Sequence, residues 1–236
     1  MPRHTACLQG GGGSRGYSRP DKRMMTFYVM RHGETELNRA GVFQGHMDVP
    51  LSDKGRRQAE LLGEALAGVR FDAVYSSDLS RAADTARAIM KHQSCTLILD
   101  RRLRELHGAR SQGLAPHEMA EKYPEFDKAF RLDPVNTRWP GGESFADLQE
   151  RVARAIDDIY EWNAQRPGGG IVAVVGHGGV VRCILRQAYV DDLLMEQVVG
   201  NCTITVLQRD GNTWTVLRLD DGEHLKALDL AEEDEP

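Results

Sequence analysis

The 236-residue chain is 41% hydrophobic and has a formal net charge of −5. This suits one large α/β domain with a sizeable core, or alternatively two small domains. The charge gives no electrostatic case for nucleic acid or an acidic membrane surface, and no apolar run reaches the length of a membrane span. Four scattered cysteines without a CxxC pair predict free thiols in a reducing compartment. We therefore expect a cytoplasmic protein without membrane or nucleic-acid partners.

The two ends of the chain differ in composition from the rest. Residues 1–23 are rich in Gly, Ser and Arg and lack the apolar segment of a signal peptide. We expect them to form a disordered extension, with a transit peptide as the alternative interpretation. Residues 229–236 are mostly acidic and predict a solvated tail. The folded domain is therefore expected over residues 24–228.

The predicted elements alternate between strands and helices along the first half of the chain. Short apolar runs predict strands at 26–30, 71–76 and 96–100, and helical spacing covers 53–69 and 80–90. Ser52 is suited to cap the first of these helices. Pro116 and Pro124 are each suited to the first position of a short helix.

The second half continues the alternation and ends differently. A long amphipathic helix begins at Phe145, and the most apolar strand covers 171–175, followed by a helix over 180–189. Two β-rich runs, 203–208 and 213–219, flank an Asp-Gly pair that is typical of a hairpin. The pattern predicts an α/β fold with a mostly parallel central sheet, helices on both faces and a C-terminal antiparallel hairpin.

Two histidines follow predicted strands in matching contexts. His32 comes just after the strand at 26–30, His177 comes just after the strand at 171–175, and each has a glycine beside it. In open sheets of this kind, ligands bind beyond the carboxyl ends of the strands. A single histidine at such a place is more often structural, but the matching pair favours a shared cleft.

The charged residues near these strand ends favour phosphoryl chemistry. Arg31 and Arg81 would make the cleft cationic, and guanidinium groups match phosphate oxygens in bidentate geometry. A neutral imidazole can attack phosphorus to give a phosphohistidine. Glu105, just after the third strand, is the best-placed carboxyl to give the leaving oxygen a proton. A metal site is the competing hypothesis, but the chain has no HxH, HExxH or cysteine-pair motif.

Four segments together resemble the histidine phosphatase superfamily, in its phosphoglycerate mutase-like branch. They are "RHGET" at 31–35, "SSDLSRAADTA" at 76–86, "LRE" at 103–105 and "GHGG" at 176–179. The resemblance runs from about Thr26 to about Leu225. It implies that His32 is phosphorylated, that Arg31, Arg81 and His177 complete the phosphate pocket, and that Glu105 is the proton donor. It also implies a mixed sheet between helices and a catalytic domain over 24–228.

Further residues take roles from the same resemblance. It implies that Asn38 supplies a pocket amide, that Gln44 and Gly45 lie on a substrate-side loop, and that the backbone N–H of Gly178 reaches the phosphate. The segment "WPGGES" at 139–144 resembles the stretch that closes the active-site lid. The resemblance implies no required metal or other cofactor, with 2,3-bisphosphoglycerate needed only if the protein is a mutase.

The chain departs from the family pattern in one segment. Many broad-specificity phosphatases of this branch carry Gly-x-Trp-Glu-Gly after the proton donor, but here the sequence is "HGARSQGL" at 107–114. Arg110 in this segment is expected to contact a charged substrate. The departure bears on the substrate and leaves the expected phosphohistidine chemistry unchanged.

The leading hypothesis is a phosphomonoester phosphatase that acts on a small phosphorylated metabolite, with a homodimer as a possible assembly. The alternatives are a phosphoglycerate mutase, a phosphohistidine-protein phosphatase and a non-catalytic phosphate-binding protein. A pure binder has no need of Glu105. The segment between Glu105 and Glu143 is short, whereas the resemblance implies a long insertion there in cofactor-dependent mutases, so hydrolysis is favoured. Arg110, Arg131 and Arg138 are the counter-argument, because they are candidates for a carboxylate clamp.

Overall fold

The computed structural model describes residues 24–164, 166, 169–188 and 199–228. The predictions for residues 1–23 and 229–236 lie outside this range. Among the described residues, no helix has the length and apolar character needed to cross a membrane.

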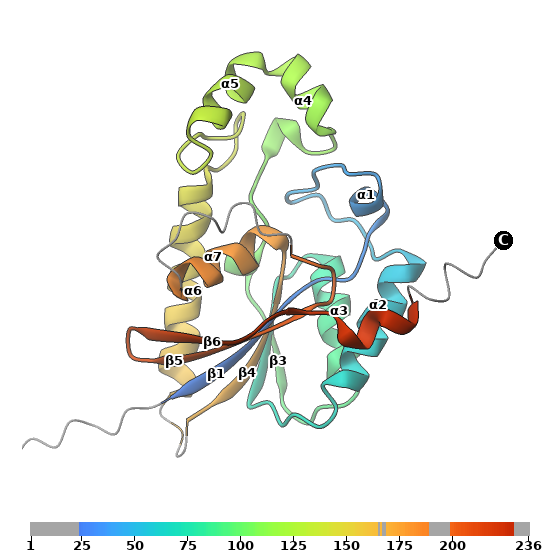
Figure 1. Ribbon diagram of the computed structural model, residues 1–236, viewed down its shortest axis with the longest axis vertical. Coiled ribbons are helices and arrows are strands. Elements are labelled where there is room, and N and C mark those ends of the chain that lie inside the picture. Colours follow the sequence, from blue (N-terminus) through green and yellow to red (C-terminus); the bar gives the residue numbers. More distant parts are fainter. Residues whose placement is uncertain (1–23, 165, 167–168, 189–198, 229–236) are drawn as a thin grey trace, which may run out of the picture.

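A six-stranded sheet forms the centre of the molecule (Figure 1). Its order is β3-β2-β4-β1-β5-β6, and the strands span Met25–Arg31 (β1), Ala73–Ser76 (β2), Thr96–Leu99 (β3), Ile171–Gly176 (β4), Ile204–Asp210 (β5) and Thr213–Asp221 (β6). The four strands from β3 to β1 are parallel, and β5 and β6 pair antiparallel at one edge. The predicted fold class is therefore confirmed, including the hairpin that turns at Gly211 with a φ of +59°.

Helices cover both faces of this sheet. On one face, α2 (Asp53–Ala65) and α3 (Ser80–Met90) pack against alternate residues of β4, Ala173 and Val175. On the other face, α6 (Phe145–Asn163) and α7 (Gly178–Ala188) pack against Val172 and Val174. Successive side chains of a strand point to opposite faces, so a strand buried on both sides is apolar throughout. This explains why β4 is the most apolar segment of the sequence.

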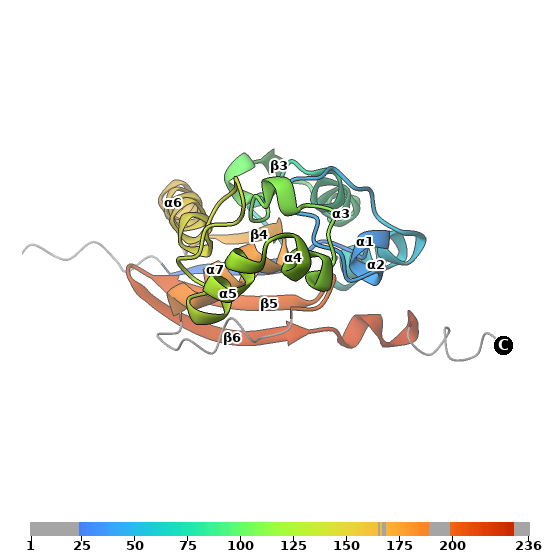
Figure 2. The same ribbon diagram turned by 90° about the horizontal axis from the view of Figure 1, so that it is seen from above.

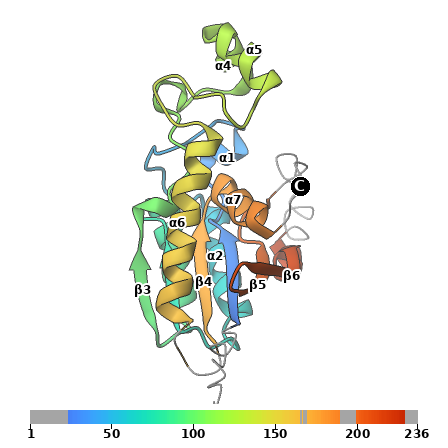
Figure 3. The ribbon, with the colours of Figure 1, turned by 90° about the vertical axis from the view of Figure 1, so that its left-hand side faces the viewer.

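The other α-helices of the described residues lie beyond the carboxyl ends of the parallel strands (Figure 1). Helices α4 (Pro116–Lys122) and α5 (Pro124–Leu132) stand away from the sheet as a cap (Figures 1 and 3), and both begin at the prolines that predicted them. Viewed from above, the cap lies over α7 and the ends of the strands (Figure 2). The short helix α1 (Glu36–Arg39) was not predicted. Within the described part of the chain, single-turn 3₁₀ helices span Arg101–Leu103, Ala109–Ser111 and Glu223–Leu225.

The two ends of α2 can be compared with the capping residue and the apolar spacing that predicted this helix. The predicted N-cap is present, because the Ser52 side chain accepts a hydrogen bond from the backbone N–H of Gly55. The helix ends at Ala65 rather than at 69, although Leu66 beyond its end is still 1% exposed. Apolar spacing therefore continues past the helix, because turn residues also fill the core.

Candidate active site

The pairing of β1 with β4 brings the two predicted histidines together. Arg31 and Gly176 are register partners at the carboxyl ends of these strands, and the backbone N–H of His32 donates to the carbonyl of Gly176 at 3.0 Å. The rings of His32 and His177 lie 5.0 Å apart between centroids, at an angle of 63°. Both side chains are buried, at 3% and 0% exposed.

The hydrogen bonds of His32 select one tautomer. Its Nδ1 lies 2.7 Å from the carbonyl oxygen of Gly33, which can only accept, so Nδ1 carries the proton. Its Nε2 accepts a hydrogen bond from Nε of Arg81 at 3.2 Å and is therefore unprotonated. Burial, followed by the charges of Arg31 and Arg81, lowers the pKa of His32 well below 6.5. The imidazole is thus neutral at pH 7, as a nucleophile requires.

Arg81 is fixed deep in the site. It lies in the first turn of α3, is 1% exposed, and donates to the carbonyl oxygens of Met47 at 2.7 Å and Gly45 at 2.8 Å. Burial, only partly offset by the charge of Glu105, lowers its pKa to about 10. Arg81 therefore remains a cation at pH 7, next to the unprotonated nitrogen of His32.

His177 and Arg31 each leave a buried nitrogen without a protein partner. His177 Nε2 lies 2.9 Å from the hydroxyl of Ser77, and Nη1 of Arg31 donates to the carbonyl of Val199 at 2.7 Å. Among the described residues, His177 Nδ1 and Arg31 Nε have no hydrogen-bond partner. Leaving a buried polar group unpaired is costly, so two such nitrogens close to His32 indicate a place for an anion.

Glu105 lies at the same end of the sheet, against the N-terminus of α7. Its Oε2 accepts a hydrogen bond from the backbone N–H of Gly179 at 3.1 Å, and its Oε1 accepts one from Leu106 at 2.8 Å. A side chain at position 179 would collide with this carboxylate, because a Cβ there would lie 2.3 Å from Oε1. The glycine therefore permits the close approach of Glu105 to the helix.

One cavity of about 490 Å³ joins these groups to the cap. Arg31, His32, Arg81 and Glu105 line one part of it, together with the predicted residues Asn38, Gln44 and Gly45. Its other lining residues are Gly41, Val42, Phe43, Leu114, Pro116, Met119, Phe126, Asp127, Phe130 and Trp139. The site is thus a charged floor beneath a largely apolar upper wall.

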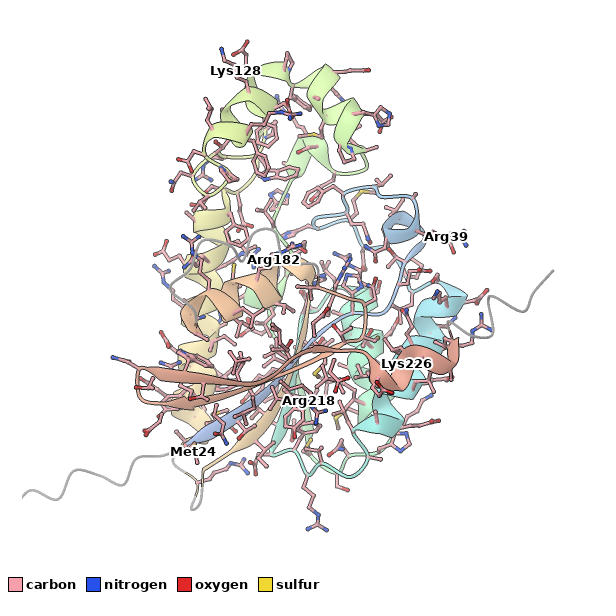
Figure 4. All side chains as sticks on the ribbon, viewed as in Figure 1. Met24, Arg39, Lys128, Arg182, Arg218 and Lys226 are labelled. Carbon is pink, nitrogen blue, oxygen red and sulfur yellow. The ribbon has the colours of Figure 1, made fainter. Side chains whose placement is uncertain are left out.

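Four predicted residues lie elsewhere or serve a second purpose. His177 contacts the ring of His32 but is not among the residues that line this cavity. Gly178 lines the adjoining cavity of about 320 Å³, where Arg182 of α7 lies beneath the cap (Figure 4). Asn38 also closes the capping box of α1, because its Oδ1 accepts from the N–H of Thr35. Arg110, expected to contact the substrate, does not line either cavity.

Arg151 was missed by the sequence analysis, and it supports the loop that carries Glu105. Its guanidinium donates to the carbonyl oxygens of Arg102, Arg104 and Glu105 at 2.7–2.8 Å and forms two hydrogen bonds of 2.8 Å with Glu143. Glu143 also accepts from the backbone N–H of His107 at 2.9 Å. Arg151 thereby connects the proposed lid segment at 139–144 to Glu105.

Two further contacts secure this loop. The imidazole Nε2 of His46 lies 2.7 Å from the carbonyl oxygen of Glu105, and Arg104 forms two hydrogen bonds of 2.6 Å with Asp78. In the sequence, the "WPGGES" motif pointed to this network through Glu143, and the arginines next to Glu105, among them Arg104, are its neighbours in the chain. Arg151 and His46 carried no such signal, because each meets Glu105 from a distant part of the chain.

Comparison with known proteins shows the family of the chain. The family model of the histidine phosphatase superfamily (branch 1) matches residues 27–222. The chain belongs to this superfamily.

Relatives within the histidine phosphatase superfamily include both phosphatases and mutase-like proteins. The chain is 37% identical to phosphoglycerate mutase-like protein 4 of Arabidopsis thaliana over 201 residues, covering 84% of this chain and 86% of that protein. It is also 37% identical to a metal-independent phosphoserine phosphatase of the same plant over 206 residues, covering 85% and 83%. The solved structure of Bacillus stearothermophilus YhfR superposes with a TM-score of 0.76 at 30% identity and covers 85% of this chain and 99% of that one. The protein is therefore an enzyme of this superfamily.

Proposed function

We propose that this histidine phosphatase superfamily member hydrolyses phosphomonoesters through a phosphohistidine at His32. The observation that carries the proposal is the neutral tautomer of His32, whose unprotonated Nε2 lies beside the cation of Arg81. In the first step, a bond forms between Nε2 and phosphorus while the ester P–O bond breaks. Glu105 gives its proton to the leaving oxygen, so the alcohol departs neutral.

The second step returns the enzyme to its starting state. Glu105, now a carboxylate, takes a proton from a water molecule whose oxygen attacks phosphorus. The N–P bond breaks, inorganic phosphate is formed, and His32 regains its lone pair. Arg31, Arg81 and Nδ1 of His177 are proposed to stabilise the charge on the transferring phosphoryl oxygens, with the N–H of Gly178.

The remaining predicted residues are proposed to orient the substrate. Asn38, Gln44 and Gly45 line the same cavity as His32, and Gln44 is 5% exposed. Gly45 also accepts the hydrogen bond that aims the guanidinium of Arg81. This reaction needs no metal ion or organic cofactor, and one relative carries the words metal-independent in its name.

A phosphoglycerate mutase is the second candidate, because one relative is named mutase-like. A mutase must bind a second anionic group of its substrate, and the candidates for a clamp were Arg110, Arg131 and Arg138. Arg131 pairs with Asp127, Arg138 pairs with Asp147, and Arg110 is not a lining residue of either cavity. This arrangement favours hydrolysis.

The test measures the products of hydrolysis and of mutase activity in the same reaction. The enzyme is incubated with 3-phosphoglycerate and a trace of 2,3-bisphosphoglycerate, and inorganic phosphate and 2-phosphoglycerate are measured. In parallel, rapid quench with p-nitrophenyl phosphate measures an acid-labile phosphoenzyme. We expect whatever 3-phosphoglycerate is turned over to yield inorganic phosphate rather than 2-phosphoglycerate, and p-nitrophenyl phosphate to give a phosphoenzyme on His32. Rapid formation of 2-phosphoglycerate with little phosphate would establish a mutase, and the lack of any phosphoenzyme or turnover would refute both functions.

A further inference from the structure

The upper wall of the cavity contains four aromatic rings in contact with one another. Phe43 stacks on Trp139 with centroids 4.4 Å apart and an interplanar angle of 27°, and Phe126 and Phe130 lie 5.2 and 5.9 Å from the same indole. We name these four side chains the aromatic roof. Each of the four residues is half-buried and lines the cavity. Phe126 and Phe130 belong to the cap, and Phe43 belongs to the loop that precedes Gln44.

Charge is distributed unevenly between the floor and the roof. The cations that line the cavity, Arg31 and Arg81, both lie at the floor beside His32. Arg182 lines the adjoining cavity, which Phe43, Phe130 and Trp139 also line. It lies toward the floor, near Arg31, because a Cβ at Gly178 would be 3.7 Å from Nη1 of Arg182 and 3.9 Å from Nε of Arg31. Among the described residues on the roof side, the charged lining residue is a carboxylate, Asp127.

This asymmetry bears on the part of the substrate that leaves with the ester oxygen. With the phosphoryl group at His32, the leaving group extends toward the aromatic roof, where the described lining residues of the larger cavity present ring faces and no cation. An apolar group gains free energy by leaving water for such a wall. A carboxylate there would lose its hydration, and the charged residue that lines the roof side is Asp127, which already pairs with Arg131.

We infer that the substrate is a phosphomonoester whose leaving group carries an uncharged apolar portion, best a planar ring, bound against the aromatic roof. The inference rests on the proposed function and names the substrate class of the same site. It separates this chain from enzymes that take small doubly anionic or zwitterionic substrates, such as phosphoglycerates and phosphoserine. Phe43, Phe126, Phe130 and Trp139 are thus specificity residues, with no part in the bond-breaking steps.

The test compares substrates with the same leaving-group chemistry. Propyl phosphate and 3-phenylpropyl phosphate both release a primary alcohol, so a difference in kcat/KM reports the phenyl group alone. One methylene in an apolar pocket changes kcat/KM by about tenfold to 200-fold, so a phenyl ring should favour the larger ester by at least about tenfold. O-phosphoserine and 3-phosphoglycerate should be poorer substrates than 3-phenylpropyl phosphate.

Variants and a binding assay connect the preference to the roof. Phe130→Ala and Trp139→Ala should each reduce the kcat/KM ratio of the two alkyl phosphates several-fold. Trp162→Ala is the matched control, because Trp162 lies on α6, is 60% exposed and does not line the cavity. The non-hydrolysable propylphosphonate and 3-phenylpropylphosphonate, used as competitive inhibitors, should show the same ranking without turnover.

Three results would overturn the inference while leaving the proposed function intact. They are a ratio near 1 in the parent enzyme, a ratio unchanged in both roof variants, and a higher kcat/KM for phosphoserine or 3-phosphoglycerate than for the phenyl ester. In each case the phosphoenzyme of His32 would still form. Loss of all turnover and of the phosphoenzyme would refute the proposed function, and the inference would fall with it.

Discussion

The replacement Arg151→Met should test whether the loop of Glu105 depends on a single guanidinium. The change removes one charge of the ion pair with Glu143 and every hydrogen bond to the carbonyl oxygens of Arg102, Arg104 and Glu105. Methionine keeps much of the side-chain length, so the lost interactions are mainly polar.

The magnitude follows from the burial of the pair. Removing one partner of a buried ion pair costs about 3–5 kcal/mol, because the other charge stays buried without compensation. The side chains of Arg151 and Glu143 retain 19% and 22% exposure, which gives water partial access and favours the lower end, about 3 kcal/mol. For a domain of this size each kcal/mol lowers Tm by about 2–4 °C, so a fall of about 6–12 °C is expected.

The assay is urea unfolding at pH 7, with Arg154→Met as the matched control. Arg154 lies on the same helix and pairs with Glu150, but its side chain is 71% exposed, so its loss should cost about 0–1 kcal/mol. Hydrolysis supplies the second readout, because a displaced Glu105 should slow alkyl phosphates more than p-nitrophenyl phosphate. Equal stability of the Arg151 and Arg154 variants, with equal losses for both substrates, would refute the reasoning.

The pH dependence of the stability difference between the parent and Arg151→Met is a further check that the ion pair with Glu143 causes it. Burial raises the pKa of Glu143, but hydrogen bonds from Arg151 and the His107 N–H outweigh it, so the pKa lies below the usual 4.5. A carboxyl with a lowered folded-state pKa contributes stability above its unfolded pKa and loses it as pH falls. The stability gap between the parent and Arg151→Met should therefore narrow below about pH 4.5.

Four further predictions concern the floor of the cavity. His32→Ala should abolish turnover and the acid-labile phosphoenzyme in rapid quench; phosphate found on His177 would contradict the proposal. Glu105→Gln should slow alkyl phosphates by about 10²–10⁴ and p-nitrophenyl phosphate less, since that phenolate leaves without a proton, and equal losses would indicate a structural role. Because burial, then Arg31 and Arg81, lowers the pKa of His32 well below 6.5, phosphoenzyme formation measured by single-turnover kinetics should not decline as pH falls from 7.5 to 6; an imidazole limb near 6.5 would count against it. Gly179→Ala should displace Glu105 and lower kcat for alkyl phosphates about tenfold or more. The control Gly68→Ala should leave kcat unchanged, because no atom lies within 4 Å of a Cβ at that position. Similar kcat values for the two variants would show that the position of Glu105 does not limit the reaction.

The sequence was sufficient for those features that depend on local patterns. Apolar periodicity and the two helix-opening prolines predicted the main strands and helices. The positions of His32 and His177, just past the ends of two predicted strands, predicted that they share a cleft. The short helix α1 was missed because its four residues are too few for a periodic signal, and its Thr35–Asn38 capping box lies inside the motif assigned to catalysis. Local patterns thus predicted which strands carry the site.

The features that the sequence could not supply depend on contacts between distant segments. In the sequence, Arg151 is indistinguishable from any polar residue on an amphipathic helix, and its role depends on the contact of that helix with the loop of Glu105. The tautomer of His32 requires the approach of Arg81 from α3, and the aromatic roof requires that Phe43 meet Trp139 across the cavity. The spacing of residues along the chain does not predict such contacts between distant segments.

The order of the strands in the sheet has a consequence for how the chain acquires its structure during synthesis. Strand β1 ends at Arg31, but its neighbours β4 and β5 begin only at Ile171 and Ile204. While the ribosome is still making the intervening helices, β1 has neither partner, and its apolar side chains cannot yet be covered by α6 and α7. Such long-range pairing slows folding and exposes partly made chains to aggregation. The enzyme therefore assembles its catalytic floor late, when the insertion of β4 between β1 and β2 brings His177 to His32.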